Sequence, residues 1–177
     1  MAQTRIFSDR ELDDLIAEAM APTKVNRFAG ITDINGDVIT DKYSRVVDAV
    51  RAGVSLANAN LRGQNLYRAN LMGAKLSGAD LSRIDLRDAN LVRADLSNAN
   101  ITKANLTNAD LSMDASGRPT DLRGADLSNS VLAGADLTGA LLSGARLVNV
   151  DLSEVIGLTA DQLRNAVVTG ATGLPSR

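Results

Sequence analysis

The sequence offers few side chains that could carry out chemistry, and the most suggestive group is an alternation of acidic and amide residues near the N-terminus. Asp33, Asn35 and Asp37 alternate as the oxygen ligands of a calcium-binding loop do. An EF-hand loop, however, has glycine at its sixth position and glutamate at its twelfth, whereas here Gly36 is fourth and Ser44 is twelfth. The dipeptide Asn35-Gly36 between β-branched residues is instead typical of a β-hairpin turn. We therefore expect a hairpin here and no metal site.

Histidine and cysteine are both absent from the sequence. Their absence excludes histidine general bases, cysteine nucleophiles, disulfides, and the zinc, haem and iron–sulfur sites that rely on these ligands. Serines are abundant but have no histidine to activate them, and the four lysines show no serine–lysine motif. A glycine-rich phosphate-binding loop is also missing. The sequence thus predicts a protein that is not an enzyme, with no catalytic residues, no metal site and no cofactor.

The composition limits how a core can be built. The 177 residues are 45% hydrophobic, but they include only two Phe, two Tyr and no Trp. Aromatic rings usually supply much of the volume of a core, so aliphatic side chains must fill this interior in a regular way. The net charge of −2 argues against a general polyanion binder. Because we find neither a signal-peptide pattern nor an apolar stretch of the roughly 20 residues that span a bilayer, we expect a soluble, cytoplasmic protein.

A five-residue repeat runs through the middle of the chain. An aliphatic residue recurs at every fifth position, with one interruption after residue 111. Alanine stands two places before it in thirteen of the nineteen repeats, and Asp or Asn stands one place before it in fourteen. The predicted core consists of the nineteen central residues: Leu56, Leu61, Leu66, Leu71, Leu76, Leu81, Leu86, Leu91, Leu96, Ile101, Leu106, Leu111, Leu122, Leu127, Leu132, Leu137, Leu142, Leu147 and Leu152.

A period of five fits neither of the regular secondary structures. On an α-helix, successive leucines would lie about 140° apart and spread around the cylinder. On a flat strand, an odd period would place alternate leucines on opposite faces. The leucines can share one interior only if the backbone turns a corner in every repeat, so that short extended pieces wind into coils about 4.8 Å apart. The sequence therefore predicts an all-β solenoid.

The pattern Ala-[Asp/Asn]-Leu-x-x closely resembles the pentapeptide-repeat family over residues 54–153. The resemblance implies a right-handed, four-sided β-helix with one repeat per side and about twenty residues per coil. It also implies that the central leucine and the alanine two places before it point inward, while the other three positions face outward. We interpret residues 113–120, which contain Gly117 and Pro119, as a loop that occupies one side. Counting that loop as a side gives about five coils.

The flanking segments have patterns of their own. In residues 1–53 we expect an amphipathic helix over residues 9–20, the hairpin over residues 31–40, and a second helix from Tyr43 toward Gly53. In residues 154–177, Thr159 could start a short helix that ends at Ala166. Solenoid ends need caps against end-to-end association. We interpret both flanks as caps, with a partner-binding role for the longer N-terminal segment as the alternative.

Stacking residues twenty apart, with a shift of one residue after the loop, predicts columns of charged side chains on the surface. Four basic residues fall on one face: Arg62, Arg83, Lys103 and Arg123. Arg68 and Arg87 fall on the adjoining face. Such a stripe could bind a polyanion or an acidic partner. The alternative is a solvated mixed face, because acidic residues share the same two faces: Asp80, Asp85, Asp121 and Asp126.

Outward apolar residues form a second candidate surface. Met72 and Val92 stack on one face, Val131 lies near that column, and Leu141 lies elsewhere. Scattered exposed apolar residues are normal on soluble proteins. A column covered by a partner, or by the N-terminal helix, is the alternative.

These observations favour a non-catalytic scaffold whose partner is another protein, as a monomer or a homodimer, without direct nucleic-acid binding. The family resemblance suggests an alternative, because several relatives mimic DNA and bind DNA gyrase or topoisomerase IV. Mimicry requires a strongly negative surface and these relatives often have central Phe, whereas residues 54–152 hold ten Asp, ten Lys or Arg, and no central Phe. A polyanion binder that uses the basic stripe is the third possibility.

Overall fold

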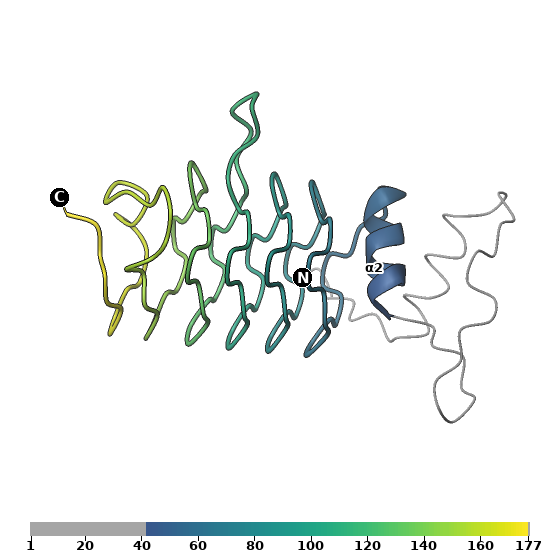
Figure 1. Cartoon of the computed structure of the whole chain (residues 1–177), viewed down its shortest axis with the longest axis horizontal. Coiled ribbons are helices and arrows are strands. Elements are labelled where there is room, and N and C mark those ends of the chain that lie inside the picture. The colour runs from purple at the N-terminus through teal and green to yellow at the C-terminus, as the bar shows by residue number, and fades with distance from the viewer. Residues whose placement is uncertain (1–41, 177) are drawn as a thin grey trace, which may run out of the picture.

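The computed structural model describes residues 42–176. The helix predicted over residues 9–20, the hairpin over residues 31–40 and the candidate calcium pattern within it lie outside the described residues. From residue 42 onward the chain forms a helix, α2 (Lys42–Arg51), and then a rod of stacked coils that extends toward the C-terminus (Figure 1).

The coils stack through parallel backbone pairing between residues twenty positions apart. Ser55 pairs with Lys75, and Lys75 pairs in turn with Asp95. Three further columns of single-residue β-bridges follow the same rule, one for each remaining side of the coil. The sides stay this short because the chain turns a corner in every repeat. The protein is therefore an all-β solenoid, a right-handed quadrilateral β-helix, as the sequence predicts.

A tight turn follows each central residue. The carbonyl of Leu56 accepts a hydrogen bond from the N–H of Ala59 (3.0 Å), and equivalent bonds recur around the coils. In all repeats except those of Leu111 and Leu152, the second residue after the central residue has a positive φ, which is the mark of the third residue of a type II turn. All ten non-glycine residues with positive φ in the described structure stand at this position, and exposed Arg83 (φ 60°) and Lys103 (φ 58°) are two of them.

The Asp and Asn residues of the repeat fix the start of each turn. In all fourteen repeats that contain one, its Oδ1 accepts a hydrogen bond from the backbone N–H two residues later, as Asn60 does from Arg62 (3.2 Å). These are Asx turns, and the acidic and amide side chains of the repeat therefore stabilise the scaffold itself.

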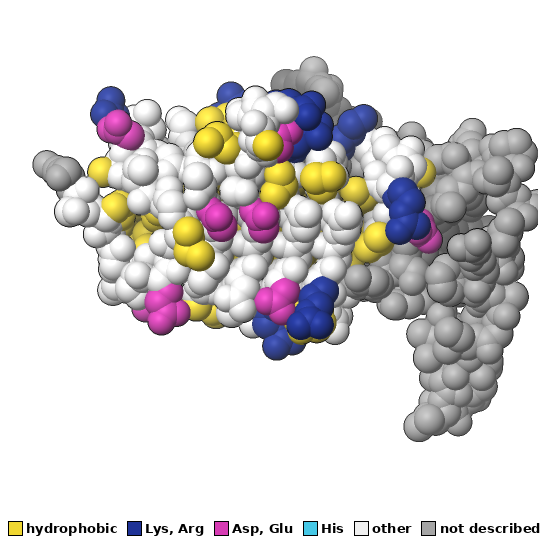
Figure 2. Space-filling model, turned by 45° about the horizontal axis from the view of Figure 1, so that its top comes forward, with side chains coloured by type: hydrophobic (Ala, Val, Ile, Leu, Met, Phe, Trp, Pro, Cys, Tyr) yellow, Lys and Arg dark blue, Asp and Glu magenta, His cyan; other side chains and the backbone are white. Residues whose placement is uncertain are grey.

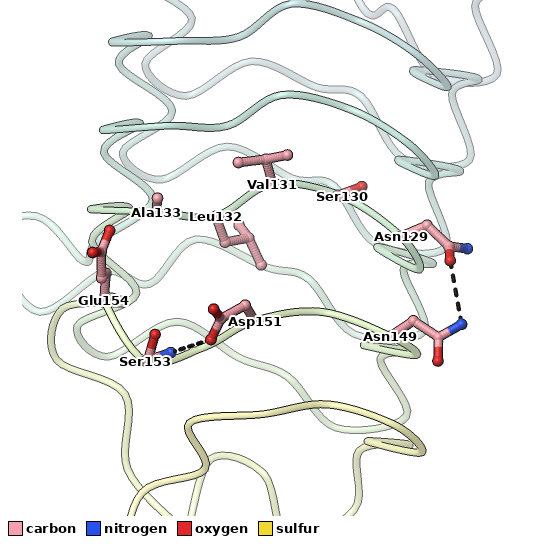
Figure 3. A pocket seen from close by; sticks show the side chains of 9 residues that line it. All are labelled: Asn129, Ser130, Val131, Leu132, Ala133, Asn149, Asp151, Ser153 and Glu154. Atoms are coloured by element: carbon pink, nitrogen blue, oxygen red, sulfur yellow. Dashed lines mark hydrogen bonds between the residues drawn. The ribbon is translucent and has the colours of Figure 1, made fainter.

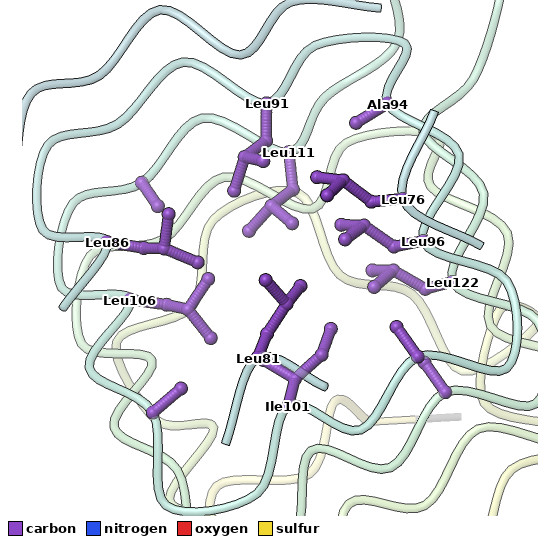
Figure 4. Close-up of a cluster of buried hydrophobic side chains, with 14 of the residues drawn as sticks. Leu76, Leu81, Leu86, Leu91, Ala94, Leu96, Ile101, Leu106, Leu111 and Leu122 are labelled. Atoms are coloured by element: carbon purple, nitrogen blue, oxygen red, sulfur yellow. The ribbon is translucent and has the colours of Figure 1, made fainter. Parts of the chain in front are cut away.

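The core is a narrow tube of aliphatic side chains. All nineteen central residues are buried, and so are the thirteen alanines two places before them. Figure 4 shows leucines of successive coils stacked in columns that converge on the axis, with Leu76, Leu96 and Leu122 forming one column. Burying one such side chain stabilises the fold by roughly 1.5–3 kcal/mol.

The prediction that residues 113–120 occupy one side of a coil is wrong. Asp110 pairs with Asp136, so bridged residues are twenty-six positions apart across this region, whereas they are twenty apart in the coils before it. Leu111 and Leu122 therefore lie on consecutive sides, and six additional residues project from the corner between them as the loop seen in Figure 1. The predicted shift of one residue after the loop is wrong for the same reason.

Hydrogen bonds fix the loop between Leu111 and Leu122 both at its buried base and near its exposed tip. The hydroxyl of Thr120, which takes the inward place usually filled by alanine, lies 3.0 Å from the carbonyl oxygens of both Leu91 and Ser112. Near the tip, the Asp114 carboxylate accepts hydrogen bonds from the backbone N–H (2.9 Å) and the Nε–H (2.8 Å) of Arg118. The insertion thus leaves the stack of coils above and below it intact.

Helix α2 covers the N-terminal end of the tube. Its residues Val46 and Ala49 are fully buried and belong to the same core cluster as the leucines, while Val47 and Val50 are partly buried against it. The helix thereby shields the first coil, where the leucine column would otherwise meet water.

The prediction of a short helix from Thr159 to Ala166 is wrong, because these residues form turns. Thr159 and Gln162 do interact like a capping box, with Gln162 Oε1 accepting from the Thr159 N–H (2.9 Å). However, the Gln162 amide also donates to the carbonyl of Leu137 (2.8 Å), and the chain must rejoin the stack at Val167. Too few residues remain to offset the cost of nucleating a helix.

The end of the chain adds two sides of a sixth coil. Val167 pairs with Arg146, and Thr172 pairs with Asp151. Ile156 supplies the fourth side of the fifth coil, so the predicted total of five coils is reached through this residue and not through the loop.

We expect Leu96→Lys to prevent folding, because it places an ammonium group in the middle of the tube, where no described side chain could pair with it. An unpaired buried charge costs several kcal/mol, which is a large part of the 5–15 kcal/mol that usually stabilises a domain. Circular dichroism melting measures the effect. Asn98→Lys is the matched control, since Asn98 is exposed in the turn conformation that Lys103 also adopts. A soluble Leu96→Lys protein with unchanged melting would contradict the inward position of the leucines.

We expect Thr120→Val to lower stability by about 1 kcal/mol, because it removes a buried hydroxyl donor but keeps its volume. The melting temperature should fall by about 2–4 °C. Thr120→Ser retains the donor and should melt closer to the wild type. A Thr120→Val protein that melts like the wild type, beside a destabilised Thr120→Ser protein, would show that packing of the methyl group, and not the hydrogen bond, anchors the loop.

Candidate interaction surface

Three of the predicted basic residues share one corner of the β-helix. Arg62, Arg83 and Lys103 follow Leu61, Leu81 and Ile101, which occupy the same side of three successive coils. The N–H of Arg83 donates to the carbonyl of Thr102 (2.9 Å), which fixes the Arg83 backbone directly against the next coil. We call Arg62, Arg83 and Lys103 the basic corner.

Arg123 does not belong to the basic corner, and its predicted position is wrong. The carbonyl of Arg123 accepts a hydrogen bond from the N–H of Asn98 (2.9 Å), which places Arg123 on the preceding side of the coil. Because the insertion is six residues long, the residues that continue the basic corner are Asn129 and Asn149, whose side chains are joined by a hydrogen bond (3.3 Å). The sequence interpretation missed these two residues, although the spacing of twenty-six would have revealed them.

The basic corner also differs from its surroundings in charge pairing. Arg123 pairs with Asp121 (2.5 Å) and Arg146 pairs with Asp126 (3.3 Å). Among residues 46–176, none of the three side chains of the basic corner forms an ion pair. Arg62 makes only a long hydrogen bond to the Ser82 hydroxyl (3.5 Å). Their charges therefore face the solvent without a partner from the described part of the chain.

The adjoining face is neutralised. Arg87 binds both oxygens of Asp85 (2.9 and 2.7 Å), and Arg68 lies 3.6 Å from Asp88. Both guanidinium groups contact the ring of Tyr67, whose centre lies 4.9 Å from that of Arg68 and 5.4 Å from that of Arg87. The hydrogen bond from Arg87 lowers the pKa of Asp85. This cluster is a packed, mutually satisfied surface. In Figure 2, several basic side chains likewise lie beside an acidic one, and two acidic side chains lie together near the middle of the face.

The apolar surface is only partly as predicted. Met72 and Val92 do stack, since the N–H of Gly73 donates to the carbonyl of Val92 (2.8 Å), and Met72 is 49% exposed. Val131 does not lie near them, because it pairs with Asn105 on another side. The sequence interpretation missed Met113, which is 43% exposed at the base of the loop.

A groove of about 350 Å³ lies on the side that carries Val131, between the fourth and fifth coils (Figure 3). Val131, which is 50% exposed, lines this groove. The basic corner leads directly to this groove, because Asn129 and Asn149 form one of its edges, while Asp151 and Glu154 lie toward the other. The predicted position of Val131 is thus wrong, but the residue is part of a concave surface.

Five aspartates of the described chain have pKa values shifted from the ordinary one. The pKa values of Asp85, Asp114, Asp121, Asp126 and Asp151 are all lowered by hydrogen bonds or basic neighbours, whereas a general acid requires a raised one. Among residues 42–176 we find no group of three or more acidic residues that could hold a metal ion. In the same part of the chain, no helix is long and apolar enough to cross a membrane.

The fold and surface define the class of protein as a right-handed β-helical repeat protein. A family model for pentapeptide repeats matches residues 52–83, 79–112 and 120–156 in eight copies, which is more than half of the chain. The chain belongs to the pentapeptide-repeat family. A comparison with curated proteins gives no match.

Three solved structures illustrate the similarity. HetL from the cyanobacterium Nostoc, a pentapeptide repeat protein involved in heterocyst differentiation regulation, is 29% identical, with 68% of this chain and 66% of HetL covered and a TM-score of 0.31. QnrB1, a plasmid-mediated fluoroquinolone resistance protein, is 19% identical, with 67% and 59% covered and a TM-score of 0.46. The Nostoc pentapeptide repeat protein alr5209 is 29% identical, with 73% and 93% covered and a TM-score of 0.28. The chain therefore spans less than two thirds of the length of HetL and QnrB1.

We expect the protein to lose stability in acid. Since the folded structure lowers the pKa of the five aspartates below the ordinary value of 3.8, their contribution is complete above that pH and is lost as the pH falls through the folded values. Thermal melting between pH 6 and pH 2.5 should show a melting temperature that falls below about pH 4. A melting temperature that stays constant or rises on acidification would contradict these assignments. Arg87→Gln should weaken the dependence, because it removes the main cause of the shift at Asp85.

Proposed function

We propose that the protein is a non-catalytic interaction scaffold of the cytoplasm, a rigid β-helix that presents columns of side chains to a protein partner. The observation that supports this proposal is the pairing of the charged side chains. The repeat's aspartates are bound to the backbone or to arginine, whereas the basic corner has no ion-pair partner in the described chain. Such a surface suits recognition and offers no acid–base pair for catalysis.

Rigidity supports the same role. Each coil is tied to the next by backbone hydrogen bonds of about 2.7–3.1 Å on every side, and each corner is closed by its own turn. Side chains on neighbouring coils are therefore held at a fixed spacing before any partner arrives. A surface organised in advance loses little conformational entropy on binding.

Mimicry of DNA is the less favoured function. A mimic must present a strongly negative surface, but the carboxylates of Asp85, Asp121 and Asp126 are each paired with an arginine of this chain. Among residues 46–176, exposed groups without an ion pair carry both signs: Arg62, Arg83, Lys103 and Lys75 are basic, and Asp151 and Glu154 are acidic. We therefore do not expect the protein to protect DNA gyrase from a quinolone in a supercoiling assay.

Affinity capture with the immobilised full-length chain tests the scaffold function. We expect one or a few proteins to bind wild-type protein in stoichiometric amount at physiological salt, and to bind again when the pair is reconstituted from purified components. Leu96→Lys, which we expect not to fold, is the negative control. Absence of any reconstituted partner, or protection of gyrase from quinolone, would contradict the proposal.

A further inference from the structure

We infer that the basic corner binds an extended acidic segment of the partner protein. This inference rests on the proposed function and identifies the chemistry of the partner. It is drawn from the pairing of charges, the spacing of the coils, and the groove beyond the corner.

The basic corner is an exception among the cations of the described structure. Eight other arginines, from Arg51 to Arg164, each form an ion pair with an aspartate. Arg62, Arg83 and Lys103 are exposed and form none within the described residues. Lys75 shares this property but lies alone on another side. Three adjacent positive charges of this kind repel one another, and an anionic partner would relieve that repulsion.

The spacing suits an extended peptide. The three residues belong to successive coils, which are about 4.8 Å apart along the rod, so the set spans about 10 Å in that direction. Arg83 and Lys103 occupy equivalent places in their turns, and Arg62 lies one residue earlier in its turn. On an extended chain, side chains that point to one side recur at about 6.8 Å. Two or three carboxylates at alternate positions would therefore match the corner, and the long side chains of Arg62, Arg83 and Lys103 can take up the difference.

The surroundings favour a peptide over a nucleic acid. A nucleic-acid backbone is charged along its whole length, but the corner continues beyond Lys103 as the neutral Asn129 and Asn149. The groove beside them exposes Val131 and has Asp151 and Glu154 toward its far edge, which would repel phosphates. A peptide can end its acidic run at the third coil and place an apolar side chain on Val131.

Fluorescence anisotropy with the full-length chain tests this inference. The probe is a labelled peptide of about nine residues that alternates glutamate with serine and ends in two leucines. We expect wild-type protein to bind it, with affinity that falls as salt is raised, and to bind the glutamine version at least about tenfold more weakly. An oligothymidylate of similar length should bind more weakly than the acidic peptide.

Two variants locate the site. Arg83→Asn combined with Lys103→Asn should weaken binding at least about tenfold, and it should fold, because Asn98 and Asn108 adopt the same positive φ. Lys75→Asn is the matched control and should bind like the wild type. Equal loss in both variants, no binding of the acidic peptide at physiological salt, or tighter binding of the oligonucleotide would overturn the inference. If the captured partner still binds the double variant, the inference fails while the scaffold function stands.

Discussion

The structure depends on one constraint: every fifth residue must reach the same narrow interior. A chain can meet this constraint only by turning a corner in each repeat, which is why the residue two places after leucine has a positive φ around the coils. Backbone N–H groups that have no partner within their own coil donate hydrogen bonds to carbonyl groups of the neighbouring coil. The alanine two places before leucine follows from the width of the tube, and the Asp or Asn between them follows from the need to organise the turn. The abundance of leucine, alanine, aspartate and asparagine and the corner in every repeat thus follow from the same constraint.

The same constraint explains which features the sequence could predict. The period of five identifies the buried residues, because no other backbone path brings them together, and it predicts the solenoid. The prediction for the insertion is wrong because the eleven-residue step from Leu111 to Leu122 can be divided either into two sides and one extra residue or into one side and a loop of six. The second division is correct, because Thr120 and Asp121 occupy the alanine and aspartate places of the regular repeat centred on Leu122. A hydroxyl in the alanine place is hard to recognise until its acceptors, the carbonyls of Leu91 and Ser112, are known.

That error changed the candidate surface more than the fold. With the correct spacing, Arg123 leaves the basic stripe and Asn129 and Asn149 enter it, so the stripe becomes a short basic corner followed by amides and a groove. The pairing of side chains could not be read from the sequence at all, because Arg87 and Arg83 are both exposed arginines of the repeat and only one of them binds a carboxylate. A face whose arginines are paired with carboxylates of the same chain is neutralised, whereas arginines without such pairs remain free to bind a partner.

The position of the basic corner depends on the spacing of twenty-six residues across the insertion, and engineered cysteines test it most directly because the chain has none of its own. Lys103→Cys and Asn129→Cys would occupy equivalent positions in adjacent coils, about 4.8 Å apart, which suits a disulfide. We expect this pair to oxidise readily within one molecule, as measured by thiol titration and mobility on a non-reducing gel. Lys103→Cys with Arg123→Cys, which lie on different sides of the coil, should keep two free thiols. A disulfide in the second pair and none in the first would contradict the arrangement of the coils and of the corner built on it.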